Sequence, residues 1–318
     1  MSLVRKAVIT AAGRGTRQYP ATSAAQKAML PLVDRDGLTK PAIQIIAEEA
    51  LEAGIEEICI VVSPGDESQF RQHFKAMEEE MLPAFAGKEW AVKESEKLAR
   101  IERALTFAVQ ETPEGYGHAV YQARSFVRDE PFLLLLGDHI YVSRDGDRCA
   151  RQLMDSFCQG RAEALSAVQP TPADRIHLFG VIQGTPLDGS GRLYQVASIK
   201  EKPSVDYASR HLSTPGLASG SFLCHFGMHV FPPLIFDCIE QHIRDKVREN
   251  GEVQLTSAQD RMRTQLSRYY CLDVNGDRYD TGIPFGLMEA QIALALSGVH
   301  RREMARSIFR LLERELRL

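Results

Sequence analysis

A glycine-rich loop near the start of the chain carries the clearest chemical signal. The residues Gly13-Arg14-Gly15-Thr16-Arg17 directly follow a short β-branched run over 6–10, and Lys27 comes a little further on. Ligands of an open parallel sheet bind at the carboxyl ends of its strands, where glycines let the backbone approach a phosphate closely. Arg17 and Lys27 would add the positive charge that a polyphosphate attracts. The loop is therefore predicted to bind phosphate groups.

This loop differs from two common phosphate-binding motifs. A dinucleotide-binding G-x-G-x-x-G would need glycine at the position of Gln18, and a P-loop would need Gly-Lys-Ser or Gly-Lys-Thr after the glycines. Taken alone, the two glycines could equally belong to a flexible surface loop with solvated arginines. Both interpretations stay open until the rest of the chain is considered.

The elements around the loop have the order of a βαβ unit. The run over 6–10 is short and apolar, as expected of a buried strand. Pro41 starts a helical pattern that stops at Gly54, which is the usual placing of these two residues. A second apolar run follows over 58–62. This order predicts two parallel strands joined by a right-handed helical crossover.

The rest of the chain continues the alternation less regularly. The run over 132–136 is apolar throughout, which is typical of a central parallel strand, and Asp138 stands just beyond its carboxyl end. The other expected elements are a charged helix over 67–103, a strand over 106–109, a helix over 117–126, shorter strands over 179–183, 193–200 and 221–231, and helix from Pro284 onwards. Because no repeat or low-complexity linker interrupts them, one continuous α/β domain is predicted.

Composition and charge exclude several classes of protein. The 318 residues are 44% hydrophobic and 25% charged, which is typical of folded globular proteins. A net charge of −4 argues against coating nucleic acid or an anionic membrane, although the first 33 residues hold five basic and no acidic side chains. Six scattered cysteines indicate neither a disulfide framework nor a zinc site. With no segment of membrane-span length and no signal-peptide core, a cytoplasmic protein is expected.

Several motifs together resemble the sugar-phosphate nucleotidylyltransferases, and most closely the bacterial UTP–glucose-1-phosphate uridylyltransferases. In chain order they are A-x-G-x-G-T-R from Ala11 to Arg17, Pro20 and Thr22, K-x-M-L-P from Lys27 to Pro31, Gln110, Gly115-Tyr116-Gly117-His118-Ala119, Gly137-Asp138, Phe179-Gly180-Val181, Glu201-Lys202-Pro203, Gly251 to Thr256, and Asp280-Thr281-Gly282. The resemblance implies a single Rossmann-like, glycosyltransferase A-like domain over 1–298. Its mixed, mostly parallel sheet would be flanked by helices. A C-terminal helix over 299–318 would pack on this domain or at a subunit interface.

The resemblance also implies roles for the loop and for the residues that meet the base. The nucleotide-binding residues would be Ala11, Ala12, Gly13, Gly15, Thr16, Arg17, Gln110 and Gly115. Arg17 would contact the phosphates, and Lys27 would stabilise charge while the α-phosphorus is attacked. Gln110 can pair with a base edge as both donor and acceptor, and Gly115 lets the base pack flat on the backbone. The alternatives are that Arg17 and Lys27 are solvated surface side chains and that Gln110 and Gly115 belong to an ordinary turn.

Two carboxylates and a group of sugar-phosphate-binding residues complete the implied site. Asp138 and Asp280 would hold Mg²⁺, which prefers hard oxygen ligands. Glu201 would accept hydrogen bonds from sugar hydroxyls, Gly180 would lie in the same subsite, and Lys202 would hold the sugar phosphate in line. Arg17, Lys27 and Lys202 are thus the implied catalytic residues. The alternatives are that Asp138 and Asp280 are unrelated turn residues and that Glu201 and Lys202 form a surface ion pair.

The implied reaction transfers a nucleotidyl group from a nucleoside triphosphate to a sugar 1-phosphate and releases pyrophosphate. The resemblance favours UTP as the nucleoside triphosphate and glucose 1-phosphate as the sugar 1-phosphate. The alternatives are a thymidylyl-, guanylyl- or cytidylyltransferase, or a non-catalytic regulatory homologue that binds a nucleotide sugar. Relatives commonly form dimers or tetramers, so a homo-oligomer is expected. The chain departs from the family pattern at Ala28, where glutamate is usual, at Ser23, where lysine is usual, in a longer segment over 204–221, and over 222–229.

Overall fold

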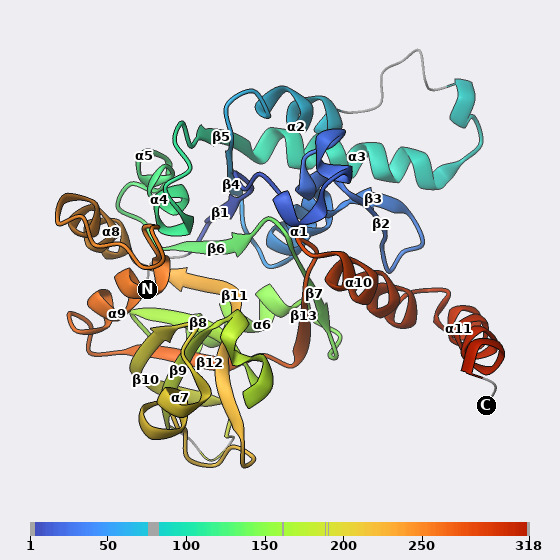
Figure 1. The fold of residues 1–318 in the computed structure, drawn as a ribbon. Coiled ribbons are helices and arrows are strands. Elements are labelled where there is room, and N and C mark those ends of the chain that lie inside the picture. The colour runs from blue at the N-terminus through green and yellow to red at the C-terminus, as the bar shows by residue number, and fades with distance from the viewer. Residues whose placement is uncertain (1–3, 76–82, 161, 188, 190, 317–318) are drawn as a thin grey trace.

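The chain folds around one large mixed sheet (Figure 1), seen in a computed structural model that describes residues 4–75, 83–160, 162–187, 189 and 191–316. In this part of the chain nine strands stand in the order β5-β4-β1-β6-β11-β8-β12-β10-β9. Their bounds are β1 Lys6–Thr10, β4 Glu57–Val62, β5 Leu105–Val109, β6 Phe132–Leu136, β8 Ala164–Pro172, β9 Gly180–Pro186, β10 Leu193–Glu201, β11 Ser221–Phe231 and β12 Tyr269–Asp273. Two small ribbons are added, β2 Pro31–Val33 with β3 Thr39–Pro41, and β7 His139–Ser143 with β13 Gly276–Asp280.

The sheet is parallel throughout in only one half, and the other half has a single parallel pair, β12 with β8, among its described strands. Strands β5, β4, β1 and β6 are parallel, with Val8 of β1 opposite Cys59 of β4 and Leu134 of β6. Beyond β6, β11 runs antiparallel to β6, β8 and β9, and β10 runs antiparallel to β9 and β12. The prediction of a mostly parallel sheet is therefore wrong for this half. The segment 187–192 between β9 and β10 is too short for a crossover helix, so the two strands form an antiparallel hairpin.

The alternation of side chains along each strand divides the core between the two faces of the sheet. Ile9 faces a cluster that includes Ile46 of α1 (Ala42–Glu52) and Leu153 of α6 (Cys149–Gly160). Val8 faces the opposite cluster, which includes Val120 of α4 (Tyr116–Tyr121) and Ile239 of α8 (Leu234–Arg244), with α9 (Leu255–Arg263) beside them. Both faces are buried, which explains why β1 and β6 are apolar at nearly every position.

Two predicted helices are interrupted. The stretch expected as one helix over 67–103 forms α2 (Glu67–Phe74) and α3 (Glu89–Ala104), and residues 76–82 of it lie outside the described part of the chain. The helix expected over 117–126 is split into α4 and α5 (Arg124–Val127). The predicted strands over 132–136 and 221–231 are confirmed at the same bounds.

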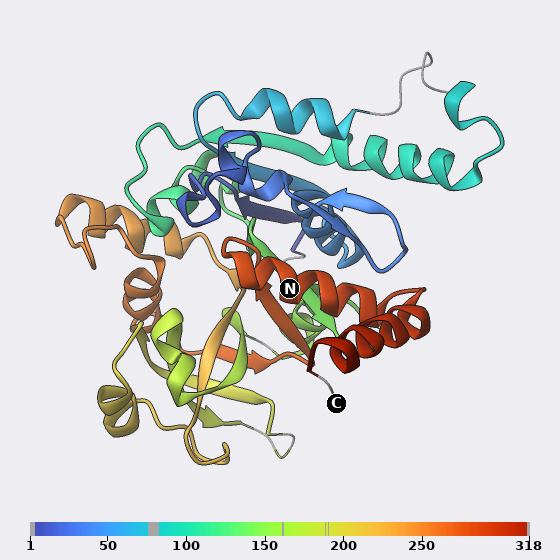
Figure 2. The same ribbon diagram turned by 45° about the vertical axis from the view of Figure 1, so that its right-hand side comes forward.

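The chain ends in two consecutive helices at one side of the molecule. Helix α10 (Pro284–Ser297) and helix α11 (Arg301–Leu316) lie next to each other in both ribbon views (Figures 1 and 2). The described residues of α11 are all at least partly exposed, among them Phe309 and Leu316. The last two positions of the predicted terminal helix, 317–318, lie outside the described residues. Among the described helices, none has both the length and the apolar character that a membrane span requires.

Candidate functional site

The glycine loop leaves the end of β1 and folds back over Lys27. Ala11 continues the sheet, because its N–H donates to the Val61 carbonyl at 2.8 Å. Gly15 has φ +65°, a left-handed conformation that favours glycine. A Cβ atom at Gly13 would lie 2.8 Å from Lys27 Nζ, so the bare glycine backbone lets the lysine lie against the loop. The two predicted phosphate-binding features, the loop and Lys27, are therefore in contact.

Two polar side chains hold this loop, and the sequence analysis gave neither of them a role in doing so. Thr22 Oγ1 donates to the Gly15 carbonyl at 2.9 Å. The Gln26 side-chain amide donates to the Ala11 carbonyl, and its oxygen accepts from the backbone N–H of Ala28. Gln26 therefore caps the short turn Lys27–Met29 and fixes the start of the loop at the same time. The sequence signal for this role is the position of Gln26, a polar residue just before a helical turn.

The carboxylates of Asp138 and Asp280 meet although they lie far apart in sequence. Strand β7 follows Asp138, and its pairing with β13 places His139 opposite Asp280. Thr281 secures the junction, since its N–H and Oγ1 donate to the Asp138 carbonyl at 2.8 and 2.9 Å. Gly282 fits between the carboxylates, because a Cβ there would lie 2.8 Å from Asp138 Oδ2 and 2.9 Å from Asp280 Oδ1. The structure therefore brings together the two residues predicted as metal ligands.

His139 joins these carboxylates as a third group that could hold a metal ion. One ligand atom from each of Asp138, His139 and Asp280 lies within 4.8 Å of the others. His139 Nδ1 is 3.1 Å from Asp138 Oδ1. His139 was not among the predicted metal ligands, although it directly follows Asp138 in the sequence.

Basic side chains pair with both carboxylates. Lys27 Nζ contacts Asp138 Oδ2, and both side chains are largely buried. Burial alone would favour the neutral acid, but the positive charge of Lys27 and the hydrogen bond with His139 hold the pKa of Asp138 well below its ordinary value. Arg17 Nη1 lies 3.6 Å from Asp280 Oδ2, and the Arg17 side chain is 60% exposed. Asp138 is therefore ionised, and Arg17 remains accessible to a ligand.

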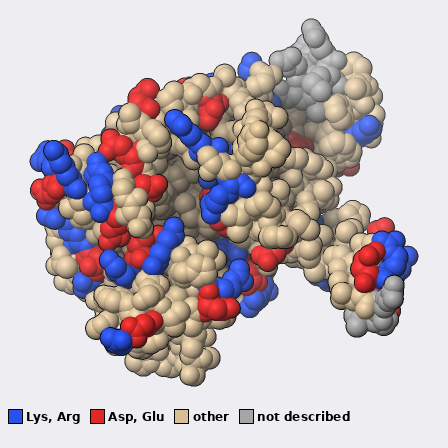
Figure 3. All heavy atoms as spheres, viewed as in Figure 1, with Lys and Arg blue, Asp and Glu red and all other residues tan. Residues whose placement is uncertain are grey.

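Arg17, Lys27 and Asp138 line a cleft of about 480 Å³ at the carboxyl ends of β1 and β6, whereas His139 and Asp280 are not among its lining residues. The space-filling view shows a hollow between the two halves of the molecule with charged side chains gathered around it (Figure 3). The lining residues are Thr10, Ala12, Gly13, Arg14, Gly15, Thr16, Arg17, Lys27, Gln110, Pro113, Gly115, Tyr116, Ala119, Leu136, Asp138, Glu252 and Gly282. Most predicted nucleotide-binding residues thus share one cleft. Ala11 is buried behind it.

Gln110 and Gly115 form one end of the cleft. Gln110 is buried, and its Nε2 donates to the Gly115 carbonyl at 3.2 Å and lies 3.1 Å from His118 Nδ1. Gly115 has φ +116°, and a Cβ there would lie 2.7 Å from the Cβ of Glu252 and 2.9 Å from the Val253 carbonyl oxygen. The positioned amide and the bare backbone beside it suit a flat ligand with polar edges.

The predicted sugar-phosphate residues form a second cluster beyond this cleft. Glu201 Oε2 accepts from Thr256 Oγ1 at 2.6 Å and lies 3.1 Å from where a Cβ of Gly180 would stand. Lys202 has φ +41°, and its Nζ lies 3.7 Å from Glu201 Oε1. Burial, followed by the charges of Asp138 and Glu201, raises the pKa of the Tyr116 hydroxyl. The sugar-phosphate residues Gly180, Glu201 and Lys202 do not line the cleft described above.

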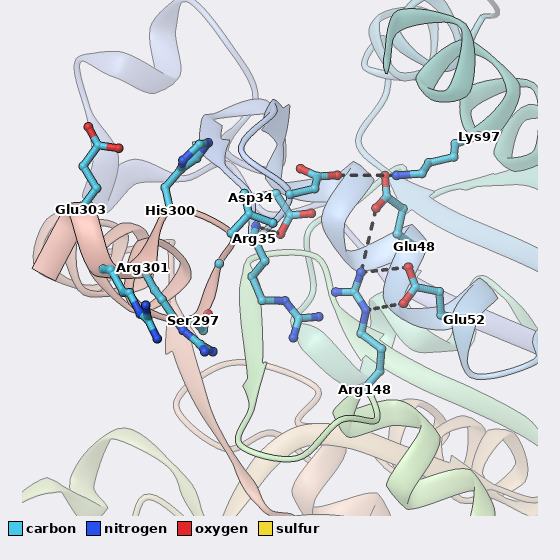
Figure 4. Close-up of a pocket in the computed structure, with 14 residues that line it drawn as sticks. Asp34, Arg35, Glu48, Glu52, Lys97, Arg148, Ser297, His300, Arg301 and Glu303 are labelled. Carbon is cyan, nitrogen blue, oxygen red and sulfur yellow. Dashed lines mark hydrogen bonds and ion pairs between the residues drawn. The ribbon is translucent and has the colours of Figure 1, made fainter. Parts of the chain in front are cut away.

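A larger cavity of about 880 Å³ lies away from all predicted site residues, where α11 begins (Figure 4). Acidic and basic side chains both line it, and several of the acidic ones pair with cations of the protein. Lys40 Nζ lies 3.0 Å from Asp34 Oδ2 and 2.9 Å from Glu48 Oε2, and Arg148 donates to Glu52 at 2.7 and 3.0 Å. Because these carboxylates are already paired, this side of the cavity has the features of a structural ion-pair network.

Comparison with known proteins gives consistent similarities over almost the whole chain. Residues 6–296 match the family model described as Nucleotidyl transferase. The chain is 37% identical to the UTP–glucose-1-phosphate uridylyltransferase of Bacillus subtilis, covering 95% of each chain, and 38% identical to that of Streptococcus pneumoniae, covering 93% of this chain and 91% of the relative. Among solved structures, it resembles a UDP-glucose pyrophosphorylase complexed with UDP-glucose, with a TM-score of 0.74, 27% identity, and coverage of 92% of this chain and 98% of that chain. It also resembles the UTP-bound enzyme from Acinetobacter baumannii, with a TM-score of 0.76, 25% identity, and coverage of 96% and 99%.

Proposed function

This chain belongs to the nucleotidyl transferase family, and from that premise we propose that it is a UTP–glucose-1-phosphate uridylyltransferase. It is an enzyme that transfers a nucleotidyl group to a sugar 1-phosphate. UTP is the donor in this proposal, glucose 1-phosphate is the acceptor, and pyrophosphate and UDP-glucose are the products. The supporting relatives carry this activity in their names, and one similar structure was solved with UTP and another with UDP-glucose.

One structural observation carries the proposal. Lys27 pairs with Asp138 in the cleft, and Arg17 pairs with Asp280 next to the same glycine loop. A buried cation–carboxylate pair and a second pair with an exposed arginine are more than a surface loop needs. They provide positive charge for a triphosphate and negative charge for a metal ion in the same place.

The reaction requires positioning and charge stabilisation rather than a nucleophilic side chain. A phosphate oxygen of the sugar 1-phosphate attacks the α-phosphorus of UTP, the bond from that phosphorus to the bridging oxygen breaks, and pyrophosphate leaves with the electron pair. Lys27 stabilises the charge that develops on the α-phosphate, and Arg17 contacts the departing phosphates. Lys202 holds the sugar phosphate in line for attack.

Asp138 and Asp280 are the proposed ligands of Mg²⁺. The donor set fits this ion, because both are carboxylates and Mg²⁺ prefers oxygen. When bound, the ion would neutralise phosphate charge during transfer. The cations that now pair with the carboxylates, Lys27 and Arg17, would remain nearby to contact the phosphates.

Base and sugar are recognised at opposite ends of this arrangement. Gln110 bonds the uracil edge, and Gly115 lets the ring lie on the backbone. Glu201 accepts hydrogen bonds from sugar hydroxyls, next to the open backbone of Gly180. This division explains why the nucleotide-binding residues share the cleft and the sugar residues form a separate cluster.

A pyrophosphate-release assay tests the function. Five nucleoside triphosphates are combined with a panel of sugar 1-phosphates, with and without Mg²⁺. The expected result is Mg²⁺-dependent release that is greatest with UTP and glucose 1-phosphate. A different best pair would identify another nucleotidylyltransferase. Binding of a nucleotide sugar without release in any combination would instead identify a non-catalytic homologue.

The terminal helix is proposed to join two copies of the chain. Helix α11 leaves Phe309 60%, Leu312 47% and Leu316 61% exposed, and α10 leaves Phe285 76% exposed. Apolar side chains gathered in this way favour burial against another surface. Light scattering after size exclusion is expected to show an oligomer that Phe309→Glu dissociates and Arg310→Glu leaves intact. A wild-type monomer would refute this part of the proposal.

A further inference from the structure

His225 lies inside the cluster that is proposed to bind the sugar. It stands on β11, within the segment 222–229 that departs from the family pattern. The ring packs against Gly180, since a Cβ at Gly180 would lie 2.6 Å from His225 Cδ2 and 3.3 Å from its Nε2. The same point in space is 3.1 Å from Glu201 Oε2. The His225 ring and the Glu201 carboxylate therefore both lie against the bare Cα of Gly180.

Neither ring nitrogen of His225 has a hydrogen-bond partner among the described residues. Both Nδ1 and Nε2 are shielded from solvent. A second histidine on the same strand shows the contrast: His229 Nδ1 lies 2.8 Å from Ser166 Oγ and 3.3 Å from Gln259 Nε2. Leaving a buried polar group without a partner costs about 1–3 kcal/mol. His229 is thus satisfied by the protein, whereas the described residues give the buried ring nitrogens of His225 no partner, a place that a ligand hydroxyl would fill.

From this geometry we infer that His225 is a sugar-recognition residue, whose ring nitrogen hydrogen-bonds a hydroxyl of the sugar 1-phosphate beside Glu201. The inference rests on the proposed function, since it assigns a residue to the acceptor subsite of that reaction. It adds a contact from β11 to those of Gly180, Glu201 and Lys202.

The chemistry of a sugar hydroxyl matches this pair of groups. A hydroxyl can donate to the Glu201 carboxylate while it accepts from an imidazole N–H. Burial, together with the charge of Arg278, lowers the pKa of His225 to about 3, so the ring is neutral and has one N–H donor and one acceptor. The χ2 torsion of histidine is soft, so the ring can turn a nitrogen toward the sugar without leaving its rotamer.

The test compares wild type with His225→Phe, which keeps a flat ring and removes both nitrogens. Each enzyme is assayed with glucose 1-phosphate and with its 2-, 3-, 4- and 6-deoxy analogues. We expect His225→Phe to lower kcat/KM for glucose 1-phosphate about three- to tenfold, the range of one neutral hydrogen bond, with KM for UTP unchanged. One deoxy analogue should show the same loss with wild type and no further loss with the variant. His211→Phe, on exposed α7 (Val205–His211), is the matched control.

Each outcome supports or overturns the inference. Equal kinetics of His225→Phe and wild type across the analogues would overturn it, and so would a parallel change in KM for both substrates, which indicates a structural role. Circular dichroism checks the fold, and His225→Asn replaces the variant if His225→Phe does not fold. If wild type releases pyrophosphate with a different sugar 1-phosphate, the deoxy analogues of that sugar are used. Failure of wild type with every sugar refutes the proposed function itself, which separates the two results.

Discussion

Replacing Lys27 with methionine tests whether the Lys27–Asp138 contact acts in catalysis or only in folding. Lys27 Nζ contacts Asp138 Oδ2, and the side chains are only 14% and 11% exposed. The substitution keeps most of the side-chain volume and removes the charge. It leaves the Asp138 carboxylate without its nearest cation, and it removes a positive charge from the place where the α-phosphate is proposed to bind.

The two roles predict effects of different size. Two charges about 4 Å apart interact by about 4 kcal/mol at an effective dielectric constant of 20, and breaking a buried pair costs about 3–5 kcal/mol. We therefore expect Lys27→Met to lower the free energy of unfolding by about 2–4 kcal/mol, because the pair is not completely buried. Loss of one charge-stabilising donor in a transition state costs about 2.7–4 kcal/mol, so kcat should fall about 100- to 1000-fold.

The double variant Lys27→Met/Asp138→Asn separates these effects. Urea unfolding should show stability recovered toward wild type, because no unpaired buried charge remains, while pyrophosphate release stays low. Lys93→Met on α3 is the control, because Lys93 pairs with Glu89 at an exposed site and should change stability by less than about 1 kcal/mol and turnover not at all. Wild-type turnover in a folded Lys27→Met variant, or turnover restored in the double variant, would refute the catalytic role.

Three further substitutions follow from the same structure. Asp280→Asn should weaken the apparent Mg²⁺ affinity in the pyrophosphate assay by more than about tenfold, and an unchanged Mg²⁺ titration would exclude this residue as a ligand. Gly115→Ala should raise KM for UTP and lower stability by about 1–3 kcal/mol, because its Cβ would lie 2.9 Å from the Val253 carbonyl at φ +116°. Burial raises the pKa of Asp273 from 3.8 to about 6. The stability that the folded protein gains from binding a proton at Asp273 is therefore complete below pH 3.8 and lost as pH rises through 6. Asp273→Asn should therefore lessen the decrease in urea-unfolding stability between pH 4 and 6, whereas Asp155→Asn, an exposed control, should not.

The parallel half of the fold and the phosphate loop were predictable because their signals are local. The strand over 132–136 is a continuous apolar run, and the structure confirms its bounds. The glycine loop is recognisable from the residue types that the backbone requires there, such as Gly15 at φ +65°. In the other half, the strands over 179–183, 193–200 and 221–231 were predicted, but their antiparallel pairing was not, because strand direction depends on which neighbour a strand reaches. The break between α4 and α5 was missed as well.

The sequence alone therefore determined which residues are available for chemistry, and the tertiary structure decided which of them meet. The motif order indicated the family, and the residue types indicated a polyphosphate, a metal ion and a sugar phosphate. The pairing of β7 with β13 brings Asp280 to Asp138 and adds His139. The packing of β11 beside β9 places His225 against Gly180. Such contacts join segments distant along the chain, and the entropy of closing those loops is offset by packing of the whole core, which no local pattern of residues records.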